Sequence, residues 1–189
     1  MAEIARSELI LGGQKSGKSR RAEMLAQHWL ASPGHDAVLI ATGQALDDEM
    51  RERIERHRRD RAVRVPRLHT VEEPFALAST VAALSAPTTL IIIDCLTLWL
   101  TNQLMPLQAL PLTAEAVRAE RERLCKLLDE PPGPVVVVGN EIGLGVIPLG
   151  PQSREFVDAL GLLNQAVAAA CERVSLMVAG CVLTLKERR

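Results

Sequence analysis

Runs of apolar residues alternate along the chain with segments of helical composition. The apolar runs predict strands at residues 7–11, 37–42, 68–71, 89–94 and 135–139, with one or two more at 175–179 and 182–185. Residues 89–94 (TLIIID) are apolar until the final acid, which is typical of a central strand buried on both faces. The pattern therefore predicts a sheet that is flanked by helices.

Segments with helix-forming composition separate the predicted strands. They predict helices at residues 20–31, 47–61, 74–84, 96–104, 114–130 and 155–174. Asp47 and Asp48 begin the second of these helices, where carboxylates favour the positive end of the helix dipole. Because strands and helices alternate, we expect right-handed crossovers and a mainly parallel sheet in an α/β fold.

The length and charge of the chain narrow its possible partners. Its 189 residues, 48% of them hydrophobic, suit one substantial core, so we expect a single domain over residues 1–189. A net charge of -1 gives no overall field that would recruit nucleic acid or anionic lipid, and small solutes are the expected partners.

No apolar stretch has the length of a membrane span, and residues 1–8 lack the features of a signal peptide. We therefore expect a cytoplasmic protein.

The cysteines suggest neither a zinc site nor a disulfide framework. Cys95, Cys125, Cys171 and Cys181 form no CxxC pair and stand in apolar or helical segments. We expect them to be buried, reduced thiols.

Residues 9–19, LILGGQKSGKS, contain the full phosphate-loop pattern, in which Gly12 precedes four residues and then Gly17-Lys18-Ser19. A predicted strand precedes this P-loop (residues 12–19) and a predicted helix follows it. Glycines let backbone N–H groups face phosphate oxygens, and the helix N-terminus adds a favourable field. We expect Lys18 to reach the terminal phosphates and the Ser19 hydroxyl to ligate Mg²⁺. The alternative is a glycine-rich turn with a chance lysine.

A nucleotide site of this kind also needs an acid at the end of a neighbouring strand, to hold the metal or its waters. Asp94, which ends TLIIID, is the best candidate. Its alternative role is to cap the helix that follows.

His57 is the residue that could decide the reaction. Met50, Ile54 and His57 follow one another at helical spacing, so the imidazole continues the apolar stripe of its helix and points inward. Two interpretations stay open at this point: a core or interface histidine, or a nucleophile that attacks phosphorus. The arginines nearby suit either a transferring phosphoryl group or a solvated basic face: Arg56, Arg58, Arg59 and Arg61.

Segments along nearly the whole chain resemble the bifunctional adenosylcobinamide kinase / adenosylcobinamide-phosphate guanylyltransferase family. In order they read GGQKSGKSRRAE, IATGQALDDEMRERIERHRRDR, TVEEP, IIIDCLTLWLTN, GNEIGLGVIP and LNQAVAAACERVSLMVAGCVLTLK. The P-loop is shared by many unrelated proteins. The combination of the DDEM…RI..HR, DCLTLWLTN and NEIGLGVIP segments is specific to this family.

The resemblance implies two activities in late cobalamin assembly. A nucleoside triphosphate, ATP or GTP, phosphorylates the hydroxyl of the aminopropanol arm of adenosylcobinamide. GTP then donates GMP to the new phosphate, which gives adenosyl-GDP-cobinamide and pyrophosphate, and a histidine carries GMP covalently in between. The resemblance also implies a P-loop NTPase fold, RecA-like, with Mg²⁺ as cofactor and a homo-oligomer, a trimer, as the assembled form. The sequence does not decide between ATP and GTP in the kinase step.

The resemblance also assigns site residues, with His57 as the carrier of GMP and Lys18 as a second catalytic residue. The expected triphosphate-binding residues are Gly12, Gly13, Gln14, Lys15, Ser16, Gly17, Lys18 and Ser19. The expected guanine nucleotide site comprises Thr42, Gly43, Gln44, Arg58, Arg59, Asp60 and Arg61. Glu72 and Asp94 are expected to contact nucleotide or metal, with Ser19 and Asp94 as the metal ligands.

The chain departs from the family pattern in two places that concern the base and ribose. Leu68 stands where many members have tryptophan, and GVIPLGP lacks the acidic or amide residue often found after the proline. Three other hypotheses stay open: a small-molecule kinase without guanylyl transfer, a RecA-like ATPase acting on nucleic acid, and a regulatory subunit that binds nucleotide without turnover. Two tryptophans, two phenylalanines and no tyrosine provide little base stacking, which disfavours the nucleic-acid hypothesis.

Overall fold

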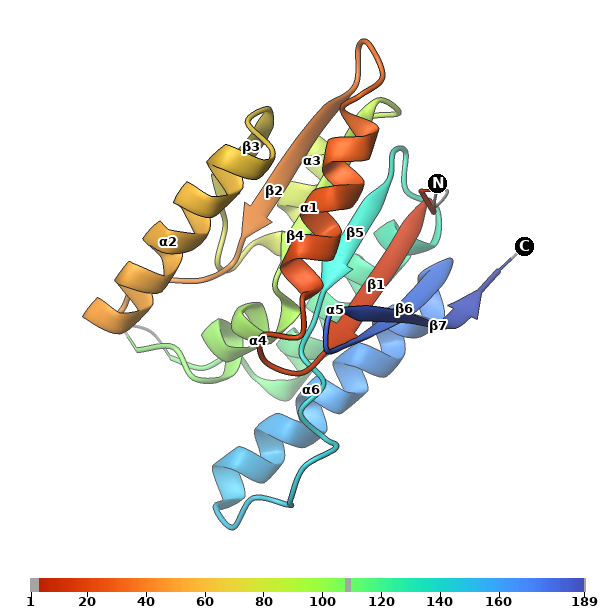
Figure 1. The fold of residues 1–189 in the computed structure, drawn as a ribbon. Coiled ribbons are helices and arrows are strands. Elements are labelled where there is room, and N and C mark those ends of the chain that lie inside the picture. Colours follow the sequence, from red (N-terminus) through yellow and green to blue (C-terminus); the bar gives the residue numbers. More distant parts are fainter. Residues whose placement is uncertain (1–3, 108–109, 189) are drawn as a thin grey trace.

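The computed structural model describes residues 4–107 and 110–188, and one seven-stranded sheet runs through it (Figure 1). The strands are β1 (Ser7–Gly12), β2 (Asp36–Ala41), β3 (Leu68–Glu72), β4 (Thr89–Asp94), β5 (Val135–Val138), β6 (Arg173–Val178) and β7 (Cys181–Glu187). Their spatial order is β3-β2-β4-β5-β1-β6-β7. Neighbouring strands are parallel except for β6 and β7, which form an antiparallel hairpin. The predicted α/β fold with a mainly parallel sheet is confirmed.

Helices cover both faces of the sheet (Figure 1). They are α1 (Lys18–Trp29), α2 (Asp48–Arg64), α3 (Leu77–Leu84), α4 (Leu96–Leu104), α5 (Ala114–Asp129) and α6 (Pro151–Ala170). The helices α1 and α2 lie on one face, and α3, α5 and α6 lie on the other. The first two crossovers between parallel strands therefore lie on one face and the next three on the other, as in other doubly wound sheets.

The predicted boundaries of two helices are wrong. The helix predicted at 155–174 begins at Pro151 and ends at Ala170, because Arg173 pairs with Glu8 of β1 and the chain continues as β6. The helix predicted at 74–84 begins only at Leu77. The Glu73 carboxylate accepts hydrogen bonds from two successive backbone N–H groups just before Leu77, at 2.9 and 2.8 Å, and holds that segment in a turn.

The strand residues alternate between two apolar cores, one on each face. In β4, Ile91 and Ile93 pack toward α3 and α4, and Leu90 and Ile92 pack toward α1. All four are fully buried, at 0% exposure, as the uninterrupted apolar run predicts. Burial on both faces fixes the register of the strands, and the register places the residues that follow them.

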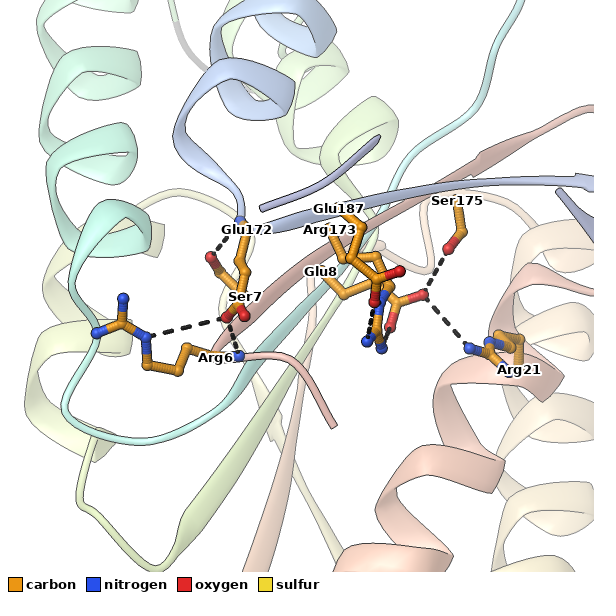
Figure 2. A network of polar contacts seen from close by, with 8 residues as sticks. All are labelled: Arg6, Ser7, Glu8, Arg21, Glu172, Arg173, Ser175 and Glu187. Atoms are coloured by element: carbon orange, nitrogen blue, oxygen red, sulfur yellow. Dashed lines mark hydrogen bonds and ion pairs between the residues drawn. The ribbon is translucent and has the colours of Figure 1, made fainter. Parts of the chain in front are cut away.

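A buried ion network joins the two ends of the P-loop (Figure 2). The carboxylate of Glu8 on β1 is 1% exposed and accepts a hydrogen bond from Ser175 Oγ at 2.7 Å. It lies 3.6 Å from Arg21 of α1 and 3.6 Å from Arg173 of β6. Arg173 also donates to Glu187 of β7 at 2.6 Å. Because β1 leads into the P-loop and α1 leads out of it, the network fixes the strand and the helix relative to each other.

The four cysteines are free thiols with different environments. Cys95 and Cys171 are buried and Cys125 is half-buried, but Cys181 is exposed at the start of β7. The prediction that all four are buried is therefore wrong for Cys181, because the hairpin that carries it lies at the edge of the sheet. Within residues 4–107 and 110–188, no helix is long and apolar enough to cross a membrane.

Candidate active site

The parallel strands bring the predicted site residues to one edge of the sheet. Ala41, at the end of β2, pairs with Glu72 on one side and with Asp94 on the other. Asp94 lies opposite Val138 of β5, and β1 ends nearby in Gly12. Figure 1 shows the loop between β1 and α1 at this edge. Ligands bind at the carboxyl edge of open parallel sheets, so this is the expected place for a nucleotide.

The P-loop is packed so closely that Gly12 has no room for a side chain. A Cβ atom at Gly12 would lie 2.5 Å from the Met177 carbonyl oxygen and 2.7 Å from Ser16 Oγ. Gly17, which caps α1, has a left-handed φ of 102°. These two glycines let the backbone curl around the space where phosphate is expected.

Backbone hydrogen bonds from distant segments hold the P-loop in this conformation. The Gly180 N–H in the β6–β7 turn donates to the Ser16 carbonyl at 3.0 Å. The Glu141 N–H, just after β5, donates to the Gly12 carbonyl at 3.1 Å. Sequence reasoning did not identify either brace, because a contact through backbone atoms leaves no residue signature.

Lys18 lies over the P-loop, where its ammonium donates to the Gly13 carbonyl at 2.6 Å. Burial lowers the pKa of Lys18, and the neighbouring Cys95 and Asp94 oppose that shift. Burial, with the Asp94 charge, raises the pKa of Cys95 to about 11, so its thiol is protonated near neutral pH. Asp94 therefore supplies the negative charge that faces the Lys18 ammonium.

Asp94 does not cap the helix that follows it. The N-cap of α4 is Cys95, and no side chain caps that end. Within the described ranges, no hydrogen bond or ion pair engages the Asp94 carboxylate. Burial lowers the pKa values of Lys18, His57 and Arg61, and the Asp94 charge opposes that lowering in each. The carboxylate thus lies where P-loop and α2 side chains converge, and the capping alternative is wrong.

His57 lies on the side of α2 that faces Asp94. It is half-buried, as are Met50 and Ile54 before it on the same stripe, and Arg61 one turn later is buried. Burial lowers the pKa of His57 from its ordinary value of 6.5; Asp94 opposes the shift, and Arg53 and other nearby arginines reinforce it. The imidazole is therefore neutral near pH 7, the state that a nucleophile requires.

Ion pairs position α2, which has little apolar surface of its own. Asp47 caps its first turn by accepting from the Met50 N–H at 2.7 Å. Arg64 near its end pairs with the buried Glu23 of α1, with 2.8 Å between Nε and Oε2. Glu23 was not predicted as part of the site. The sequence shows only a glutamate on the helix that follows the P-loop, and its burial becomes visible in the structure.

A cavity of about 330 Å³ lies beside α2 at the ends of β2 and β3. Of the predicted guanine nucleotide residues, Gly43, Gln44 and Arg58 line it, together with Glu72, which was expected to contact nucleotide or metal. Arg58 and Glu72 form an ion pair, and beyond that pair a second cavity of about 330 Å³ is lined in part by Arg61. The residues that line these two cavities include no P-loop residue and not His57.

Other predicted residues lie outside both cavities. Arg59 and Asp60 are exposed, and Arg59 pairs with Glu55 at 3.9 Å on the outer side of α2. Gln14 and Lys15 are exposed on the P-loop, and Ser19 is half-buried in the first turn of α1.

Thr42 is fully buried, and its side chain forms hydrogen bonds with the protein backbone. Its hydroxyl donates to the Cys95 carbonyl at 2.7 Å and accepts from the Cys95 N–H at 2.8 Å. Asn102 donates to the Thr42 carbonyl at 2.8 Å. Thr42 therefore connects the ends of β2 and β4. Asn102 was not predicted as a functional residue.

The family model described as "Cobinamide kinase / cobinamide phosphate guanyltransferase" matches residues 8–185. The chain belongs to this family. The resemblance seen in its motifs is thereby confirmed over the whole folded region, from the strand before the P-loop to the last strand.

Curated relatives of this family member match over most of their length. One is the "Bifunctional adenosylcobalamin biosynthesis protein CobP" of Pseudomonas aeruginosa, 48% identical over 95% of this chain and 96% of the relative. The CobU proteins with the same description match at 35% identity in Escherichia coli and 34% in Salmonella typhimurium, each over 94% of this chain and 98% of the relative.

Two solved structures share the fold at low sequence identity. The PH0250 protein of Pyrococcus horikoshii has a TM-score of 0.57 and 9% identity, covering 100% of this chain and 89% of its own. The flagellar accessory protein FlaH of Methanocaldococcus jannaschii has a TM-score of 0.51 and 13% identity, covering 98% and 80%. Together with the strand, P-loop and helix at the sheet edge, they confirm the predicted P-loop NTPase fold.

We predict that Gly12→Ala lowers the free energy of unfolding by about 2 kcal/mol or more, because its Cβ has no space beside backbone that cannot move. Gly13→Ala is the matched control. No atom lies within 4 Å of a Cβ at Gly13, so its free energy of unfolding should change by less than about 1 kcal/mol. Urea unfolding measures both, and equal losses would contradict the packing described for Gly12.

Proposed function

We propose that the protein phosphorylates adenosylcobinamide with a nucleoside triphosphate and then transfers GMP from GTP to adenosylcobinamide phosphate through a GMP–His57 intermediate. Family membership supports the two activities. The observation that supports the histidine step is the position of Asp94, whose charge acts on both Lys18 of the P-loop and His57 of α2. A phosphate held by Lys18 would therefore lie on the side of α2 that carries the imidazole.

In the kinase step, the P-loop binds the triphosphate and Lys18 neutralises its terminal charge. The hydroxyl oxygen of the aminopropanol arm attacks the γ-phosphorus in line. The bond from phosphorus to the bridging oxygen breaks, the nucleoside diphosphate leaves, and the hydroxyl proton is released. This step needs positioning and charge neutralisation but no covalent carrier.

In the guanylyl step, a ring nitrogen of neutral His57 attacks the α-phosphorus of GTP, and pyrophosphate leaves as the α–β bridge breaks. An oxygen of adenosylcobinamide phosphate then attacks the same phosphorus, the P–N bond breaks, and the imidazole is restored. The relay is advantageous because a neutral imidazole approaches the triphosphate without the repulsion that a phosphate dianion would meet. Pyrophosphate also leaves before the bulky acceptor phosphate enters.

Ser19 and Asp94 would hold Mg²⁺, with water and phosphate oxygens as the other ligands. Both offer the hard oxygen atoms that this ion prefers, and the Asp94 carboxylate is not engaged by a described side chain. When bound, Mg²⁺ would supply positive charge that offsets the negative charge of the phosphate oxygens.

The cavity beside α2 would hold the guanine nucleoside. Gly43 and Gln44 would border it from the end of β2, and the Arg58–Glu72 pair would close it from α2 and β3. A carboxylate such as Glu72 accepts hydrogen bonds from the N1–H and 2-amino groups that distinguish guanine from adenine. Leu68, at the place where tryptophan is common in the family, is buried and borders the second cavity.

We predict that incubation with GTP labelled at the α-phosphate attaches label to the protein, and that the bond is acid-labile and alkali-stable, as a phosphoramidate is. His57→Ala should abolish the label and retain phosphorylation of adenosylcobinamide, because the kinase step does not use the imidazole. His28→Ala, which changes an exposed histidine on α1, is the control and should label normally. Label that survives in His57→Ala would remove the guanylyl half of the proposal.

We predict that the rate of this labelling falls as the pH is lowered, with the midpoint of the fall below pH 6.5. The neutral imidazole is the reactive form, and burial holds the pKa of His57 below 6.5. Arg53→Gln removes a positive charge that lowers this pKa, so the acidic limb should move to higher pH. Arg118→Gln, on α5, should leave the limb in place. A limb that Arg53→Gln does not move would contradict the assignment of His57.

A further inference from the structure

The segment after β5 carries several exposed apolar side chains that the proposed reactions do not use. It comprises residues 140–150, NEIGLGVIPLG. Val146 is 96% exposed and Leu149 is 97% exposed; Ile142, Leu144 and Ile147 are also exposed. Soluble proteins expose single apolar residues often, but a cluster within one short segment usually marks a binding surface.

The polar start of this segment is attached directly to the P-loop. The Glu141 N–H donates to the Gly12 carbonyl at 3.1 Å. The Asn140 N–H donates to Thr97 Oγ1 at 3.0 Å, and its carbonyl accepts from the Asn164 amide at 3.1 Å. The beginning of the segment is therefore fixed at the point where a terminal phosphoryl group is expected.

The far end of the segment is also held. Arg154, in the first turns of α6, donates to the Pro148 carbonyl at 3.1 Å and to the Leu149 carbonyl at 2.5 Å. The apolar side chains thus project from a stretch of backbone that is anchored at both ends, with its polar end at the P-loop.

Strand order separates this surface from the proposed guanine cavity. The cavity lies at the ends of β2 and β3, whereas the segment leaves β5, which lies between β4 and β1. An acceptor that approaches along the segment would reach the P-loop without crossing the nucleoside.

We propose that residues 142–149 form the surface that binds the corrin macrocycle of the acceptor. This rests on the proposed function. The acceptor has a polar arm, whose hydroxyl must reach the phosphoryl group on the P-loop. It also has a large macrocycle, which presents methyl groups beside its amide side chains and must remain outside. The segment is arranged in the same way: its polar residues, Asn140 and Glu141, lie at the P-loop, and its apolar residues lie farther away.

The test compares two double variants in the kinase assay. Val146→Ser/Leu149→Ser should raise the KM for adenosylcobinamide about tenfold or more, because two apolar contacts to the macrocycle are lost. The KM for the nucleotide and the labelling by GTP should not change. Leu183→Ser/Leu185→Ser, at 56% and 55% exposed positions of β7, is the matched control and should retain the KM for adenosylcobinamide. An unchanged KM in the first variant would overturn the inference.

A truncated acceptor separates binding of the macrocycle from the chemistry. With 1-amino-2-propanol at high concentration, wild type and Val146→Ser/Leu149→Ser should have equal kcat/KM, since this acceptor lacks the corrin. A lower value for the variant would overturn the inference, because the segment would then act on the reaction itself.

Size-exclusion chromatography distinguishes the other possible occupant, a second copy of the chain. If Val146→Ser/Leu149→Ser lowers the oligomeric state and the β7 variant does not, the segment is a contact between copies and the inference is wrong.

Failure of the proposed function is distinguishable from failure of this inference. A wild-type protein that neither phosphorylates adenosylcobinamide nor takes label from GTP would contradict the proposed function, and this inference with it. If the wild type shows both activities and Val146→Ser/Leu149→Ser leaves the KM for adenosylcobinamide unchanged, only this inference is wrong.

Discussion

The negative charge of Asp94 is the interaction on which the candidate active site depends. It ends the central strand β4, and it favours the charged forms of Lys18 on the P-loop and of Arg61 on α2. Those two groups come from opposite sides of β4 in the sheet order, and α2 has too little apolar surface to be placed by core packing alone. The Glu23–Arg64 ion pair holds α2 against α1, and the Asp94 charge acts on groups of both the nucleotide-binding loop and the histidine helix.

The charge also explains why one site can support two kinds of transfer. Lysine, arginine and a metal-binding carboxylate stabilise a transferring phosphoryl group whatever the attacking atom is. In the proposed mechanism, a neutral imidazole at the same place would add a nucleophile without adding charge. Burial keeps that imidazole neutral, and its arginine neighbours act in the same direction. Phosphorylation and guanylyl transfer would then differ in which phosphorus is attacked and in which atom attacks it.

The order of helices and strands along the chain was predictable, because each element is indicated by residues within its own segment. The TLIIID run and the glycine pattern each specify their own structure, and Asp94 at a strand end follows from them. The predictions were wrong where distant pairing decides the outcome. Residues 171–174 follow a helix and were predicted to continue it, but the helix ends at Ala170 and Arg173, paired with Glu8, begins β6. The hydrogen bond from Gly180 to the P-loop and the burial of Thr42 likewise depend on tertiary contacts.

A crystal structure of the protein after incubation with GTP tests the central claim most directly. The account predicts a bond between an imidazole nitrogen of His57 and the α-phosphorus, with the nucleoside between Gly43 and Glu72 and the phosphoryl group within reach of Lys18. A triphosphate bound on the P-loop with an unmodified His57 ring that faces away from it, in every subunit, would contradict the account.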